Sequence, residues 1–199
     1  MEARRDSRPV DGPGSPSAAG TPPYPAHLDR AASLRDATAV RIRPIRPEDA
    51  SMEQDFVGAL SGESRYRRFF STARELTPEA IARFTRIDYD REMALVAVQA
   101  PPGAAPSIVG VTRYVRESVG RSAEFALVVA DAWQRRGLGT LLMARLEECA
   151  LDAGVRLLTG VVLASNVPML ALMRARHYDL RPAPGDHTLV EVSLHFPKG

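Results

Sequence analysis

The sequence has very little of what marks secreted or membrane-embedded proteins. Its 199 residues include a single cysteine, Cys149, so no disulfide can form within the chain, as is typical of a reducing compartment. The basic N-terminus, MEARRDSRPV, is not followed by an apolar stretch and does not predict a secretory signal. No apolar run approaches the ~20 residues of a membrane span. We therefore expect a cytoplasmic protein with no membrane partner.

Lysine and surplus charge are also scarce. Lys198 is the only lysine among 26 basic residues, and the formal net charge is only +2. Arginine keeps its charge at any working pH and contacts phosphate or carboxylate groups through a forked guanidinium. Proteins that bind nucleic acid usually carry a clustered basic surplus. The charge balance therefore predicts no nucleic-acid partner.

The histidines and the cysteine give no sign of a metal site. His27 lies near the N-terminus, and His177, His187 and His195 do not have the spacing of metal ligands. No histidine is evident as a partner of Cys149, which is expected to be a buried structural residue. We therefore expect no metal and no cysteine nucleophile.

Proline and small residues divide the chain into two parts. Six of the 16 prolines precede Ala26, where they lie among Gly, Ser and Ala. Such a segment buries too little apolar surface to offset the entropy lost on ordering. Residues 1–38 are therefore expected to form a disordered tail, and residues 39–199 a single folded domain.

The pattern of apolar residues predicts an α/β domain. Strands are expected at 40–45, 93–99, 108–116, 122–129, 157–163, 178–181 and 188–194. Helices are expected at 47–60, 64–70, from Thr77, at 137–153 and from Ser165 or Asn166 to about 176. A hairpin turn is expected at 118–121, and the strand at 157–163 is expected to run parallel to its neighbour. This order predicts a mixed, mostly antiparallel central sheet flanked by helices on both faces.

The segment Gln134–Thr140, QRRGLGT, carries the clearest chemical signal. It follows a predicted strand and opens a predicted helix, which is the arrangement of a phosphate cradle. Gly137 and Gly139 let the backbone approach a ligand, and the free N–H groups of the first helical turn attract an anion. Arg135 and Arg136 add positive charge. The sequence therefore predicts a phosphate-binding loop, and a glycine-rich turn that binds nothing is the alternative.

Two other phosphate-binding folds fit poorly. A dinucleotide-binding fold needs G-x-G-x-x-G early in the chain and an acidic residue about 20 residues later. Here the loop comes late and follows antiparallel strands. A P-loop needs G-K-[ST], which the sequence lacks.

Several segments resemble a known enzyme family. Residues 123–139, AEFALVVADAWQRRGLG, resemble the strand, loop and helix start of GNAT acetyltransferases, and NVPML at 166–170 resembles their next motif. RPIRPED at 43–49, SRYRRFF at 64–70 and IDYDREMALVA at 87–97 are similar to the acetyltransferase domain of bacterial Pat-type protein lysine acetyltransferases. The resemblance covers about 41–194. It implies the GNAT fold and transfer of an acetyl group from acetyl-CoA to an amine, first of all a protein lysine, for example of an acyl-CoA synthetase.

The resemblance also implies residue roles. Glu124 matches the general base, which takes a proton from the amine directly or through water, because a protonated lysine is inert. We expect Glu124 to be partly buried, which would strengthen it as a base; an outward-facing strand carboxylate is the alternative. The backbone of 126–129 would pair with the pantetheine arm, and the N–H of Leu127 would polarise the acetyl carbonyl. The predicted cofactor-binding residues are Ala126, Leu127, Val128, Val129, Gln134, Arg135, Arg136, Gly137, Leu138, Gly139, Thr140, Asn166 and Arg174.

Two of these residues have equally good structural explanations. Asn166 can contact the cofactor and also cap the last helix, whereas Arg174 is either a phosphate ligand or an ordinary surface arginine. Met173 stands where many family members have a tyrosine as general acid. Tyr178 stands where the family usually has Phe of a Gly–Phe pair, with His177 in place of the Gly, so we expect Tyr178 to have a packing role.

Two other functions stay open. The fold serves acetyl transfer to small amines as well as to proteins, and an acid-lined acceptor groove would favour a polyamine. Met173 in place of the tyrosine also leaves open a non-catalytic module that binds acyl-CoA.

Overall fold

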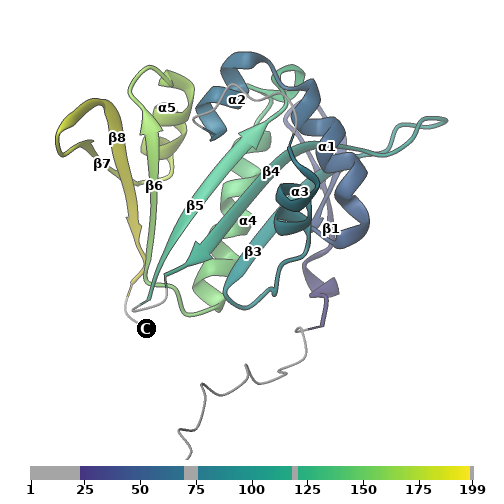
Figure 1. Cartoon of the computed structure of the whole chain (residues 1–199), viewed down its shortest axis with the longest axis horizontal. Coiled ribbons are helices and arrows are strands. Elements are labelled where there is room, and N and C mark those ends of the chain that lie inside the picture. The colour runs from purple at the N-terminus through teal and green to yellow at the C-terminus, as the bar shows by residue number, and fades with distance from the viewer. Residues whose placement is uncertain (1–22, 70–75, 118–120, 198–199) are drawn as a thin grey trace, which may run out of the picture.

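A mixed eight-stranded sheet forms the centre of the protein. The computed structural model describes residues 23–69, 76–117 and 121–197. Within these residues the strands lie side by side in the order β1-β2-β3-β4-β5-β6-β8-β7, and only the β5–β6 pair is parallel (Figure 1). The predicted mixed, mostly antiparallel sheet is therefore confirmed. The strands are β1 (Arg30–Ser33), β2 (Ala39–Pro44), β3 (Glu92–Gln99), β4 (Ser107–Arg116), β5 (Ser122–Val129), β6 (Leu157–Leu163), β7 (Asp179–Ala183) and β8 (Asp186–His195).

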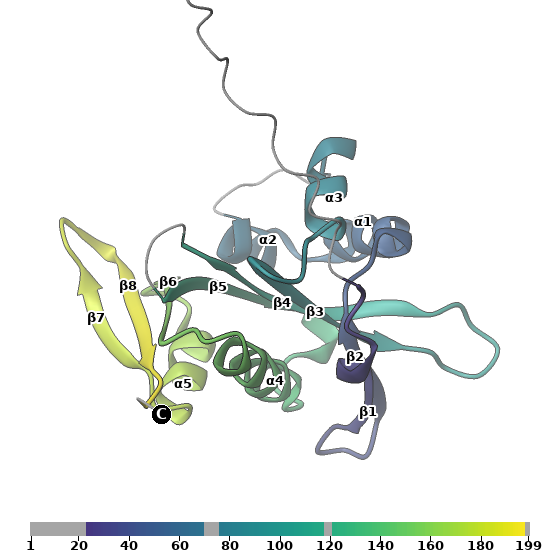
Figure 2. The same cartoon turned by 90° about the horizontal axis from the view of Figure 1, so that it is seen from below.

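Helices cover both faces of the sheet, as the sequence predicts. Figure 2 shows α1, α2 and α3 on one face and α4 and α5 on the other. No helix in the described ranges has the length and apolar character needed to cross a membrane. The helices are α1 (Ala50–Ala59), α2 (Gly62–Phe69), α3 (Pro78–Thr85), α4 (Leu138–Asp152) and α5 (Val167–Ala175).

Local sequence signals explain where the helices begin and end. The hydroxyl of Thr77 accepts a hydrogen bond from the Ala80 amide at 3.2 Å and so caps α3. The side-chain oxygen of Asn166 accepts from the Met169 amide at 3.3 Å and caps α5 in the same way. Gly154, with φ +77°, follows the end of α4 in the left-handed conformation that favours glycine. Each of these three signals is visible in the sequence.

Two hydrophobic cores lie on opposite faces of the sheet. Leu142, Met143 and Leu146 of α4 are fully buried against one face, and Phe56 and Val57 of α1 pack on the other. Because successive strand residues point to opposite faces, the apolar strands β3 and β4 supply both cores. The sheet, packed on both faces, is therefore a rigid platform from which β5 presents its residues.

The N-terminal boundary of the fold needs a correction. Arg30–Ser33 forms β1, which pairs antiparallel with residues 39–42 of β2, and Leu34 is buried in the core. A 3-10 helix, Ala26–Leu28, precedes β1, and the hydroxyl of Tyr24 donates to the Pro44 carbonyl at 3.2 Å. The expectation of a disordered tail is therefore wrong for residues 23–38. Strand pairing and the burial of one leucine hold this segment, and composition alone does not reveal such partners. Residues 1–22, residue 70 of the predicted second helix and residues 118–120 of the predicted hairpin turn lie outside the described residues.

Candidate active site

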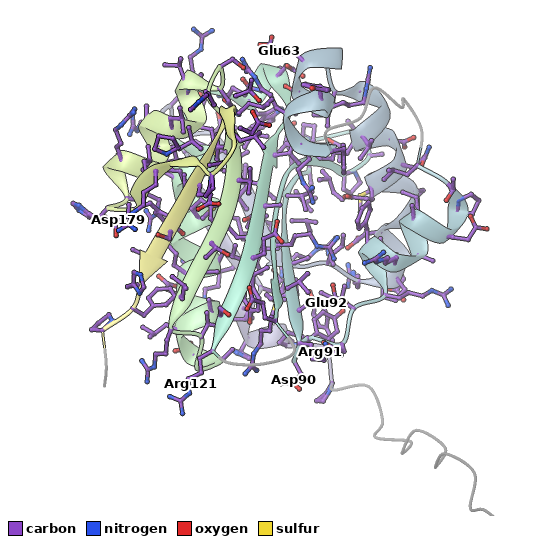
Figure 3. All side chains as sticks on the ribbon, turned by 60° about the vertical axis from the view of Figure 1, so that its left-hand side comes forward. Glu63, Asp90, Arg91, Glu92, Arg121 and Asp179 are labelled. Atoms are coloured by element: carbon purple, nitrogen blue, oxygen red, sulfur yellow. The ribbon has the colours of Figure 1, made fainter. Side chains whose placement is uncertain are left out.

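The parallel strands β5 and β6 separate part-way along their length. Their pairing covers only Ser122 to Glu124 on β5 and Leu157 to Thr159 on β6. Beyond this point β5 continues to Val129 beside β4, whereas β6 continues beside β8. Figure 1 shows the two strands diverging toward the end of the sheet at which α2 and α5 lie. Figure 3 places Arg121, just before β5, at the opposite end of the molecule from Glu63 on α2. The diverging ends of β5 and β6 form a fork, which therefore opens toward α2.

The free edge of β5 offers backbone groups to this fork. The Ala130 amide donates to the Val109 carbonyl at 3.0 Å, so it points toward the β4 side. Because amide directions alternate along a strand, the N–H groups of Leu127 and Val129 point the other way, into the fork. An extended ligand can therefore pair with this edge as an added strand would.

A cleft of about 700 Å³ occupies the fork. It is bounded by β5, β6, α2 and the first turns of α4 and α5. The structure thus brings together most of the residues that the sequence assigns to the site. The predicted residues that line the cleft are Glu124, Ala126, Leu127, Val128, Val129, Gln134, Arg135, Gly137, Gly139, Thr140 and Asn166.

Three predicted residues do not line the cleft. Leu138 is 1% exposed and belongs to the core below α4. Arg136 is held by an ion pair in which its Nε lies 2.7 Å from Oδ2 of Asp36, and its guanidinium lies over the ring of Trp133. Arg174 is exposed on α5. The structure therefore does not bring these three side chains to the predicted cofactor site.

The start of α4 fits an anion. Gly137 is the N-cap in the left-handed conformation, with φ +90°, and no side chain caps the helix. The Leu141 amide donates to the Gly137 carbonyl at 3.1 Å, so the amides of residues 138–140 precede the first helical hydrogen bond. A Cβ added to Gly139 would lie 3.3 Å from Leu172 and 3.5 Å from Leu127, so a side chain here would crowd the cleft wall. The loop can therefore hold a phosphate close to its backbone.

A polar network that the sequence analysis missed fixes α2 above the cleft. The carboxylate of Asp131 accepts hydrogen bonds from the Ser61 amide at 2.9 Å and from the Ser64 hydroxyl at 2.8 Å. The amide of Gln134 donates to the Ser64 hydroxyl and to the Val129 carbonyl, both at 3.2 Å. Burial alone would raise the pKa of Asp131. The hydrogen bonds from Ser61 and Ser64 together have the larger effect, so the pKa of Asp131 lies below its usual value. The Gln134 side chain thus joins α2 to β5 as well as lining the cleft.

Glu124 stands at the point of the fork. Together with Thr159 it forms the last pair between β5 and β6, and its side chain lines the cleft. The side chain is exposed, so the expectation of partial burial is wrong. Arg68 of α2 lines the same cleft. Burial lowers the pKa of Arg68 to about 10, with a further lowering by Arg113, whereas Glu53 and Glu124 raise it. Arg68 is therefore a cation at neutral pH and acts electrostatically on Glu124.

A second carboxyl group, on α1, is buried and interacts electrostatically with Arg68 of α2. Glu53 of α1 is 5% exposed, and its Oε2 has no hydrogen-bond partner in the described part of the chain. Burial raises the pKa of Glu53 to about 7, although the charges of Arg113 and Arg68 lower it. Helical spacing is the signal that could have found Glu53, because it lies on the same face of α1 as the buried Phe56 and Val57, whereas Asp55 is exposed.

The raised pKa predicts a pH-dependent stability. The native state keeps the Glu53 proton up to about pH 7, whereas the unfolded chain releases it near its ordinary pKa of 4.5. The free energy of unfolding should therefore fall by up to about 3 kcal/mol as pH rises through this window, and not further above it. Glu53→Gln should remove this fall. Urea unfolding of both proteins at about pH 5 and about pH 8 tests it, with the exposed strand residue Glu191→Gln as control. An equal pH dependence in wild type and Glu53→Gln would contradict the prediction.

The residues near the end of α5 have packing roles. Met173 is fully buried. Tyr178 is 5% exposed, its ring packs against Phe125, and its hydroxyl donates to Oε1 of Glu147 at 3.2 Å. Neither lines the cleft, so the predicted packing role of Tyr178 is confirmed. Cys149 is also buried, which raises its pKa to about 11, as expected of a structural cysteine.

Comparison with known proteins identifies the family. The pattern described as the Acetyltransferase (GNAT) family matches residues 60–178. The chain belongs to the GNAT acetyltransferase family. An acetyltransferase of Pseudomonas aeruginosa is 34% identical over 158 residues, which cover 79% of this chain and 84% of that protein. This chain is therefore an acetyltransferase of a family that uses acetyl-CoA as acetyl donor.

Two further relatives are of the Pat type. Acetyltransferase Pat of Mycolicibacterium smegmatis is 32% identical over 133 residues, which cover 66% of this chain but only 39% of that protein. The crystal structure of the GNAT domain of S. lividans PAT superimposes with a TM-score of 0.79 and 28% identity, and the match covers 87% of this chain and all of that domain. The resemblance to Pat-type acetyltransferase domains is therefore confirmed.

Proposed function

We propose that this GNAT acetyltransferase moves the acetyl group of acetyl-CoA to a lysine side chain of another protein, with Glu124 as general base. The observation that carries the proposal is the fork between β5 and β6. Glu124, the unpaired backbone edge of β5 and the glycine loop at the start of α4 all face one cleft there. The similarity to the GNAT domain of S. lividans PAT supports a protein acceptor.

The cleft has parts that suit each portion of the donor. The amides at the start of α4 and the guanidinium of Arg135 suit the phosphates. The free edge of β5 from Ala126 to Val129 suits the amide-bearing pantetheine arm. When bound, acetyl-CoA supplies a thioester carbonyl that an amine can attack. The N–H of Leu127 is the backbone donor that we assign to the developing oxyanion.

Glu124 makes the amine reactive. A lysine ammonium carries no lone pair for attack, so a carboxylate must take its proton before or during the reaction. The exposure of Glu124 in the cleft leaves room for an acceptor, or for a water between the two. Met173 is buried and Tyr178 is hydrogen-bonded to Glu147 outside the cleft. The proposed reaction therefore releases the CoA thiolate without help from a tyrosine acid.

The charges that line the cleft favour a protein over a polyamine. Among the described residues four arginines (Arg35, Arg67, Arg68 and Arg135) line it, of which Arg67 is paired with Glu63, against the carboxylates of Glu124 and Asp131. The carboxylate of Asp131 is already occupied by Ser61 and Ser64. A polyamine carries several positive charges and would need an acid-lined groove, which is the opposite of this lining. A single lysine near acidic side chains of its own protein suits it better.

The acceptor assignment predicts a clear preference. Incubated with acetyl-CoA, the protein should release CoA thiol faster when an acyl-CoA synthetase is present, and mass spectrometry should find acetyl-lysine in that acceptor. Its kcat/KM should exceed that for spermidine by at least about tenfold, because the arginines repel a polycation. Buffer without acceptor is the blank. Rapid turnover of spermidine or another small amine, together with no acetylated lysine in any protein tested, would overturn the protein-acceptor proposal.

A further inference from the structure

The turn between β1 and β2 reaches the glycine loop of the cleft. Backbone hydrogen bonds from Leu34 to the Thr38 carbonyl at 2.9 Å and from Ala37 to the Leu34 carbonyl at 3.0 Å close this turn. The Thr38 amide also donates to Oδ1 of Asp36 at 3.0 Å. Leu34 is buried in the core and anchors the turn. The residues between Leu34 and Thr38 are therefore held in a defined conformation.

Arg136 fastens this turn to the loop. Its Nε lies 2.7 Å from Oδ2 of Asp36, and its Nη2 donates to the Thr38 hydroxyl at 2.7 Å. The hydrogen bond from Arg136, assisted by those from Thr38, lowers the pKa of Asp36 to about 2. The carboxylate is thus charged at neutral pH and offsets the charge of Arg136. Of the two loop arginines that the sequence assigns to phosphate, one is already paired.

Arg35 lies where it can contact a phosphate in place of Arg136. Its side chain lines the cleft and is exposed. A Cβ added to Gly137 would lie 3.3 Å from both Cγ and Nε of Arg35, so the guanidinium stem rests against the N-cap of α4. Within the described ranges Arg35 takes part in no ion pair or hydrogen bond. A free guanidinium beside an uncapped helix start is well suited to a phosphate, which it can contact through two N–H groups.

We propose that Arg35 binds a phosphate of acetyl-CoA, and that the β1–β2 hairpin is therefore part of the donor site. The inference rests on the proposed function, because it requires acetyl-CoA in this cleft. Arg35 and Arg135 both line the cleft, and the Asp36–Arg136 pair fixes the turn from which Arg35 extends. Arg35 is a binding residue that discriminates phosphate-bearing donors from donors without phosphate.

Donors of different phosphate content test the inference. In the full-length protein, Arg35→Ala should weaken the affinity for acetyl-CoA at least about tenfold, since a charge-assisted contact is lost. It should leave kcat/KM for S-acetylpantetheine, which has no phosphate, within about twofold of wild type. The acetyl-CoA affinity of Arg35→Lys should lie between those of wild type and Arg35→Ala, because lysine keeps the positive charge but lacks the forked guanidinium. Arg30→Ala is the matched control, since Arg30 lies on the same hairpin but does not line the cleft.

The outcomes separate this inference from the proposed function. Wild-type affinity in Arg35→Ala would overturn the role of Arg35 and leave the proposed function standing. An equal loss with acetyl-CoA and S-acetylpantetheine would show a merely structural effect and would also overturn it. Failure of the wild type to bind acetyl-CoA would overturn both. Acetyl-3′-dephospho-CoA then locates the contact: an effect that vanishes with this donor assigns Arg35 to the 3′-phosphate, and one that persists assigns it to the pyrophosphate.

Discussion

Glu124→Gln is expected to lower kcat by about a hundredfold or more and to leave the affinity for acetyl-CoA within about twofold of wild type. Glutamine has nearly the shape of glutamate but cannot take a proton from the amine. The change therefore removes the base and little else. The measurement is the initial rate of CoA thiol release at saturating acetyl-CoA with an acyl-CoA synthetase as acceptor, beside a binding titration of acetyl-CoA.

The position of Glu124 in the sheet is the reason for expecting so large an effect. It is the last β5 residue paired with β6, so its side chain stands where the cleft begins. The N–H that we assign to the oxyanion belongs to Leu127, on the same rigid strand. A base and an oxyanion donor held by one strand keep their spacing without help from a mobile loop.

A control variant at a second exposed carboxylate distinguishes loss of the general base in Glu124→Gln from the effect of removing any one negative charge. Glu191 is also an exposed strand residue, on β8, and does not line the cleft. Glu191→Gln should keep wild-type activity. Full activity in Glu124→Gln would show that the amine loses its proton elsewhere. A loss of acetyl-CoA affinity equal to the loss of rate would show that Glu124 serves binding instead.

The donor half of the cleft can be predicted from the sequence because its signals are local. Gly137 and Gly139, the strand before them and the helix after them lie within one continuous segment, and this combination is typical of a phosphate loop. The cap residues Thr77 and Asn166 act within their own first helical turn, so their roles are equally visible. Helix and strand boundaries follow from the same short-range patterns.

The missed features all depend on contacts between distant segments. Asp36 and Arg136 are 100 residues apart in the chain, so nothing near either residue indicates their ion pair. Ser61 and Ser64 reach Asp131 across 70 and 67 residues, and the arginine charges that act on Glu53 come from Arg113 of β4 and Arg68 of α2. The environment of Glu124 is misjudged for a related reason. Its apolar neighbours Ala123 and Phe125 point to the opposite face of the sheet, so they do not cover it.

Asp49→Ala is expected to cost about 3–5 kcal/mol of unfolding free energy, because it leaves a buried arginine without its partner. The side chains of Arg43 and Asp49 are only 5% and 1% exposed. They form a two-pronged pair, with Nη1–Oδ2 and Nη2–Oδ1 distances both of 2.6 Å. Oδ2 of Asp49 also accepts from the Arg46 amide at 3.0 Å, so the carboxylate fixes the chain where it turns from β2 toward α1.

A second pair on the same strand is the control for this change. Arg41 of β2 pairs with Asp29 in the same two-pronged way, at 2.6 and 3.1 Å, but the side chain of Arg41 is 64% exposed. Asp29→Ala should therefore destabilise far less in urea unfolding, since water can take the place of the lost partner. Equal losses for Asp49→Ala and Asp29→Ala would contradict the prediction.

Removing both members of the buried pair tests its cause. Arg43→Met with Asp49→Leu should recover much of the stability lost in Asp49→Ala, because no uncompensated charge stays buried. The pair lies within RPIRPED, one of the segments similar to Pat-type domains, yet none of its residues lines the cleft. Its contribution is to hold α1, and with it Glu53, against the face of the sheet from which Glu124 extends. If the double variant retains the active site, its kcat should stay near that of wild type even where Asp49→Ala is largely unfolded.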